Sequence, residues 1–171
     1  MRNLKPGLQT IRELKKKLRR GDATAVNNIA ATYREIGNRK RAFHWWRRAA
    51  SLQDGDAWLE VGYCLQYGIG TRRNVRGAIK AYRKALVAYY ISEYCREETE
   101  YHLAIALLDF SIKRSKNEIR QLLQQASEEG DFPQATTLLA QLDLGQPLRV
   151  CRCRRGLLRR LVGKAHCALH H

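Results

Sequence analysis

Apolar residues recur along most of this chain at spacings of three, four and seven, which place side chains on one face of an α-helix. Strand-type alternation of apolar and polar residues is scarce, and the 171 residues include three prolines. The pattern therefore predicts an all-α protein and argues against a β-sandwich. The chain contains no run of 18 apolar residues, so no membrane-spanning helix is expected.

A large residue followed by a small one recurs at intervals. These pairs are Ile29-Ala30, Val61-Gly62, Leu103-Ala104 and Leu139-Ala140. The helices that follow the first three pairs each carry large and small residues on one face: Ala42, Trp46 and Ala49; Ala78, Tyr82 and Ala85; Ile119, Leu123 and Ala126. Closely crossing helices need a small residue at the contact, so the pattern predicts stacked helical hairpins with these alanines buried. Gly-Asp pairs at 21, 55 and 130 are expected to end one helix and cap the next.

Residues 57–86 resemble a Sel1-like repeat, with Val61-Gly62, the Gly68-x-Gly70 loop and the alanines from Ala78 to Ala85. Residues 24–56 are closer to the related tetratricopeptide spacing. A third unit, at about residues 99–130, follows the repeat pattern only in a degenerate form. The resemblance implies an α/α solenoid of three to four antiparallel helix hairpins, in a family of adaptors and scaffolds rather than enzymes. The two loop glycines are expected to need positive φ.

The chain divides into three parts on this interpretation. Residues 1–20 are predicted to hold a basic N-terminal capping helix, because the leucines and isoleucine of 8–20 form one stripe. Residues 21–142 form the repeat domain. Residues 143–171 are either the last helix of a fourth unit or a basic tail. Residues 87–98 either lengthen a helix or form the loop after it, and their tyrosines either pack between units or form a contact patch.

The charge is concentrated at the two ends. The net charge is +16, of which residues 1–20 carry eight bases against one acid and residues 148–171 carry seven bases and no acid. Turns within units are also basic, and turns between units are acidic. The basic edge comprises Arg39, Lys40, Arg41, Arg72, Arg73, Arg76, Lys113 and Arg114. It is either a solvated face or a docking edge for an acidic partner.

The sequence predicts no catalytic residue, cofactor or metal site. Neither His44 nor His102 has a nearby serine or cysteine that would make a nucleophile–base pair. His44 is expected to be half-buried beside Trp45 and His102 to face outward. The Cys151-x-Cys153 and His166-Cys167 spacing fits zinc poorly. Five cysteines, an odd number, indicate free thiols in a reducing, cytoplasmic compartment.

The predicted function is therefore a non-catalytic protein–protein interaction adaptor or scaffold. The concave face of the solenoid, lined by the first helix of each unit, is expected to bind the partner. The predicted contacts are Asn27, Asn28, Arg34, Glu60, Gln66 and Tyr67. The alternative function is binding of nucleic acid or an anionic membrane through residues 1–20 and 148–171, whose bases match phosphate electrostatically.

Overall fold

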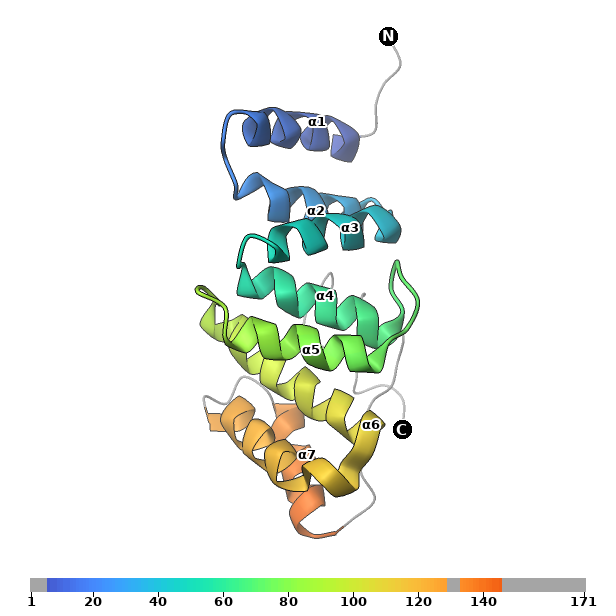
Figure 1. The fold of residues 1–171 in the computed structure, drawn as a ribbon, viewed down its shortest axis with the longest axis vertical. Coiled ribbons are helices and arrows are strands. Elements are labelled where there is room, and N and C mark those ends of the chain that lie inside the picture. Colours follow the sequence, from blue (N-terminus) through green and yellow to red (C-terminus); the bar gives the residue numbers. More distant parts are fainter. Residues whose placement is uncertain (1–5, 129–132, 146–171) are drawn as a thin grey trace.

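The chain is a column of stacked helices (Figure 1). The computed structural model describes residues 6–128 and 133–145. Within them the helices are α1 (Pro6–Arg19), α2 (Ala25–Glu35), α3 (Arg39–Ala50), α4 (Gly55–Tyr67), α5 (Val75–Leu86), α6 (Glu93–Glu128) and α7 (Pro133–Asp143). These described ranges contain one isolated β-bridge and no strand, so the predicted all-α solenoid is confirmed. Of the helix or tail predicted at 143–171, residues 146–171, with their cysteines and histidines, lie outside the described residues.

Short polar side chains and glycines set the helix ends. The side chains of Asn38, Asp54 and Asn74 accept hydrogen bonds from backbone N–H groups in the first turns of α3, α4 and α5. Gly68 and Gly70 both have a φ of 70°, as predicted for the loop after α4. A Cβ on Gly70 would overlap the carbonyl oxygen of Arg39, so this loop also needs glycine for its close approach to α3.

The predicted capping role of the Gly-Asp pairs is wrong at both described pairs, because the N-cap of α2 is Thr24 rather than Asp22. The N-cap of α4 is Asp54, and Gly55 is the first residue of the helix. The Gly55 N–H donates to the Tyr90 carbonyl at 2.8 Å, and a Cβ at this position would overlap that carbonyl. Asp56 accepts from the Ser92 N–H at 2.9 Å. The pair therefore anchors the loop between α5 and α6, which comprises residues 87–92.

The core follows the predicted pairing of large and small residues. Ala42, Ala49, Ala78 and Ala85 are all at most 1% exposed. Tyr82 of α5 lies against Gly62 of α4 so closely that a Cβ on Gly62 would overlap the ring. Buried residues form two clusters, one built from α1 to α5 and the other from α4 to α7. Helix α4 contributes to both and so joins the two halves of the column.

The sequence predicted a turn within the third unit at Lys113-Arg114. This prediction is wrong, because helix α6 runs through both residues. The helix is continuous for 36 residues. Its two halves run in different directions in Figure 1, and Leu103 and Ile119 from these halves belong to one core cluster. Residues 110–118 contain neither glycine nor proline, so nothing in them ends a helix. The unit folds back through a bend within a helix.

Replacing Gly62 by Ala should destabilise the fold, because the added methyl group overlaps the buried ring of Tyr82. The expected loss is about 1–3 kcal/mol of unfolding free energy, measured by urea denaturation followed by circular dichroism. Lys80→Ala on the exposed side of α5 is the matched control and should change the stability by less than about 0.5 kcal/mol. Equal stability of the two variants would contradict the close packing of α4 on α5.

Candidate functional site

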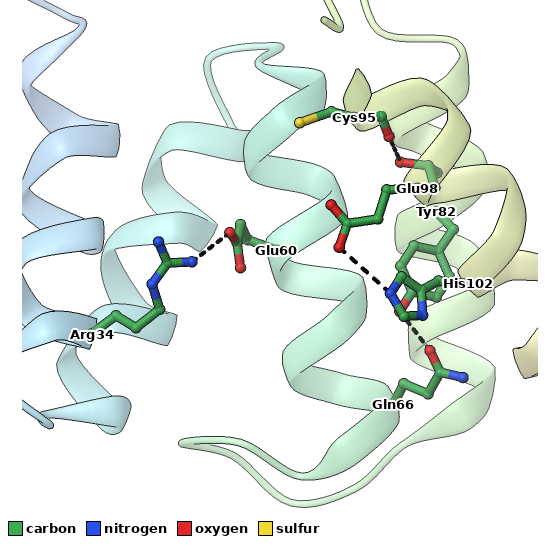
Figure 2. Close-up of polar contacts among 8 residues, drawn as sticks. Arg34, Glu60, Gln66, Tyr82, Cys95, Glu98 and His102 are labelled. Atoms are coloured by element: carbon green, nitrogen blue, oxygen red, sulfur yellow. Dashed lines mark hydrogen bonds and ion pairs between the residues drawn. The ribbon is translucent and has the colours of Figure 1, made fainter. Parts of the chain in front are cut away.

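The first helices of successive units, α2, α4 and the first half of α6, carry polar and aromatic side chains that make contacts between these helices. We call this set the polar strip. It comprises Arg34, Glu60, Tyr63, Tyr67, Glu98, Tyr101 and His102. Figure 2 shows two of the polar contacts, Arg34 with Glu60 and Glu98 with His102. Because its members come from three helices that are distant in the sequence, the strip crosses two repeat boundaries.

An ion pair links the first two units. The Arg34 Nη1 atom of α2 lies 2.9 Å from Glu60 Oε1 of α4, and the two side chains are 20% and 15% exposed. The guanidinium also lies over the Trp46 ring at 5.3 Å. Partial burial and two simultaneous contacts hold this arginine in one orientation. Figure 2 shows the contact with Glu60. The pair therefore presents a fixed arrangement of charge on this face.

His102 lies among four tyrosines, and the prediction that it faces outward is wrong. Its ring is 5.1 Å from Tyr63 and 6.1 Å from Tyr67 between centroids. It also stacks on Tyr82 at 6.1 Å. The Nε2 atom is 3.6 Å from Glu98 Oε1, and the side chain is 12% exposed. These contacts come largely from α4 and α5, so the sequence around His102 carried no sign of them.

Gln66 is also buried, which corrects its assignment as a partner contact. The residue is 1% exposed, and its Oε1 atom accepts a hydrogen bond from the Tyr82 hydroxyl at 2.6 Å. Among the other predicted contacts, Asn28 is exposed. Four are half-buried: Asn27, Arg34, Glu60 and Tyr67. Away from this face, His44 is exposed, whereas the sequence predicted a half-buried residue.

The basic edge is partly committed to contacts within the chain. Arg73 pairs with Asp109 of α6 at 3.0 Å and donates to the Gln66 carbonyl, also at 3.0 Å. Arg41 lies over the Tyr33 ring and Arg76 over the Phe110 ring. The remaining described members are exposed: Arg39, Lys40 and Arg72. Lys113 and Arg114 lie within α6, and their side chains are outside the described part.

Three glutamates of α6 are buried, which sequence reasoning missed. Glu97, Glu98 and Glu100 are 5%, 8% and 8% exposed, and Thr99 between them is fully buried. The sequence placed them in an acidic turn between units, near the N-terminus of a first helix, where negative charge suits the helix dipole. Their burial depends on contacts with parts of the chain that are distant in the sequence, and α4 and α5 both pack on α6.

Cys95 has the wrong environment for a nucleophile. Burial raises the pKa of its thiol to about 12, and the nearby carboxylates of Asp56 and Glu98 also raise it. A nucleophilic cysteine instead needs a lowered pKa. The described residues contain no group of three or more metal-binding side chains, and none of the described helices has the length and apolarity to cross a bilayer.

Tyr82→Phe should destabilise the protein, because it leaves the buried amide of Gln66 without the hydroxyl that it now contacts. The expected loss is about 1–3 kcal/mol in urea denaturation. Tyr89→Phe is the matched control, since that side chain is 98% exposed, and its effect should stay within about 0.5 kcal/mol. If Tyr82→Phe leaves the unfolding free energy unchanged, the hydrogen bond contributes nothing to the stability of the contact between α4 and α5.

Alkylation of Cys95 by iodoacetamide should be slow and strongly pH-dependent. With a pKa of about 12, its rate at pH 8 should be roughly 100-fold below that of an ordinary thiol of pKa about 8.5. The rate should keep rising about tenfold per pH unit up to pH 10, because the thiolate fraction does. Mass spectrometry of the peptide that contains Cys95 measures the alkylation rate. A synthetic peptide of residues 92–98 is the control. A plateau near pH 9 would contradict the raised pKa.

The comparisons with known proteins identify a fold. No family model and no curated protein matches the chain. Among solved structures it is similar to the crystal structure of a Sel1 repeat protein from Oxalobacter formigenes, with a TM-score of 0.58 and 23% sequence identity. The match covers 81% of this chain and 55% of that chain, so this chain spans about half the length of its structural relative. The chain therefore has the helical solenoid fold of a Sel1 repeat protein, as its resemblance to Sel1-like repeats predicted.

Proposed function

We propose that this protein is a non-catalytic adaptor that binds a protein partner along the polar strip. The observation that carries the proposal is that side chains of the strip join α2 to α4 and α4 to α6. A helical solenoid offers an extended surface made of equivalent helices, and such surfaces suit long peptide segments. The Sel1-repeat fold supports the same function class.

The chemistry of the strip suits protein recognition. Tyrosine and arginine are the residues that most often dominate binding energy at interfaces. Here Tyr67 packs on Tyr63 with ring centroids 4.6 Å apart, and Arg34 is fixed by Glu60 and Trp46. Side chains that are already held in place lose little conformational entropy when a partner binds. The strip is therefore a preorganised surface.

The proposed direct contacts are Arg34, Glu60 and Tyr67 of the polar strip, together with Asn27 and Asn28, which lie beside the strip on α2. Gln66 supports the surface from beneath through its hydrogen bond with Tyr82. Docking of an acidic partner on the exposed members of the basic edge stays a prediction, as does the cytoplasmic location. Binding of nucleic acid or an anionic membrane also stays a prediction and depends mainly on residues outside the described ranges.

Peptides selected from a random display library on the full-length chain should bind at the polar strip. The double variant Asn28→Ala/Tyr67→Ala should weaken their binding at least tenfold, or about 1.4 kcal/mol, because it removes one exposed and one half-buried contact. Fluorescence anisotropy with labelled peptides measures the affinity.

The matched control is Lys80→Ala/Tyr89→Ala, which removes one polar side chain and one tyrosine from exposed positions on α5 and the loop after it. It should leave peptide affinity unchanged. The proposal fails if selection yields no peptide tighter than about 100 µM, or if the control weakens binding more than the strip variant does.

A further inference from the structure

A hollow lies between α2, α3 and α4, beside the Arg34–Glu60 ion pair of the polar strip. It is partly open to solvent, and its inner part has room for one small polar group such as a carboxylate. Arg39 at the start of α3 also lines it. Apolar side chains form much of the wall, among them Ala42, Trp46 and Ile69. The hollow is therefore an accessible subsite that suits the head group of a short side chain.

The charged side chains around the hollow leave one positive charge uncompensated. Arg34 and Arg39 are cationic, and Glu60 is the anionic side chain of the lining. Glu60 pairs with Arg34 at 2.9 Å, whereas Arg39 makes no ion pair within the described part of the chain. Beside apolar walls the effective dielectric constant is lower than in water, so this charge acts more strongly on a ligand. The hollow therefore favours a ligand group with one negative charge.

A second, independent observation is an unused hydrogen-bond donor of Arg34. Its Nε atom is buried and has no acceptor among the described residues. The contact with Glu60 is made by Nη1, and Figure 2 shows this pair, so Glu60 does not satisfy Nε. Buried donors are nearly always hydrogen-bonded, and an unsatisfied one beside a hollow indicates a missing acceptor. The side chain is 20% exposed, and a small tilt of the guanidinium brings Nε–H to a group in the hollow.

A carboxylate meets both requirements, because it is a small anion and a hydrogen-bond acceptor. Its two oxygens match the N–H groups along one edge of a guanidinium. A backbone carbonyl would supply the acceptor but not the charge. The short apolar stem of an aspartate or glutamate side chain can pack on Trp46, whose ring also lies 5.3 Å from the Arg34 guanidinium. The chemistry of the hollow therefore selects an acidic side chain.

We propose that the hollow is an anchor pocket for one aspartate or glutamate side chain of the protein partner. The carboxylate accepts a hydrogen bond from Arg34 Nε–H and is paired with the guanidinium of Arg39. This inference rests on the proposed function, because it names the chemistry of the partner at one end of the polar strip. It also makes Arg39, which is not a member of the strip, a binding residue.

A small carboxylate tests the pocket without any partner. N-acetyl-aspartate N-methylamide, whose carboxylate is on the side chain, is titrated to about 50 mM into the full-length chain with isotope-labelled arginine. The Arg34 Nε–H signal in the NMR spectrum, identified by its loss in Arg34→Lys, should shift in a saturable manner. N-acetyl-asparagine N-methylamide has nearly the same shape without the charge and should leave the signal in place. No saturable shift with the aspartate compound would overturn the proposal.

Two arginines of α3 provide a matched pair of variants. Arg39→Ala should weaken binding of the aspartate compound at least about threefold, because it removes the uncompensated charge. Arg47→Ala removes the same charge from an exposed position on the same helix, outside the hollow, and should leave the affinity unchanged. Equal affinities of the two variants would overturn the role of Arg39. Tighter binding of N-acetylalanine, whose carboxylate is terminal, would assign the pocket to a chain end and overturn the assignment to a side chain.

The two proposals fail separately. If both hold, peptides selected on the full-length chain should contain an acidic residue, and its change to asparagine or glutamine should weaken binding roughly tenfold. Peptides that bind the polar strip with no dependence on an acidic residue would overturn the anchor pocket and retain the proposed function. A selection that yields no peptide would overturn the proposed function, and the titration with the aspartate compound then decides on the pocket by itself.

Discussion

Tyr82 connects the three helices on which the rest of the structure depends. Its ring lies against Gly62 of α4, its hydroxyl donates to Gln66 of the same helix, and it stacks on His102 of α6. A fully buried aromatic ring can come this close to a helix only where that helix has no side chain. The small residue and the tyrosine therefore fix the distance between α4 and α5 as well as their register.

This contact also explains how the two halves of the column become one body. Helix α4 contributes Val61 to the N-terminal core cluster and Leu59 to the C-terminal one. Tyr82 holds α4 against α5 and α6, while Arg34 of α2 reaches Glu60 from the other side. Each hairpin is stabilised by its neighbours, as expected for a solenoid. The polar strip inherits its fixed geometry from this central helix.

The polar chemistry of the protein is concentrated where the units meet. Ion pairs join α2 to α4, the turn after α4 to α6, and α5 to the second half of α6. Buried glutamates and the raised pKa of the Cys95 thiol belong to the same junction of α4, α5 and α6. A surface of this kind is suited to holding peptide segments, because its side chains are fixed before a ligand arrives.

The sequence by itself determined the features that depend on local spacing. The helix periodicity, the buried alanines such as Ala78 and the positive φ of Gly68 all follow from the allowed geometry of a few adjacent residues. The tertiary structure alone decided the burial of Gln66 and Glu98 and the aromatic surroundings of His102. A helix face becomes interior only when another helix covers it, and the register between helices depends on contacts between residues far apart in the chain.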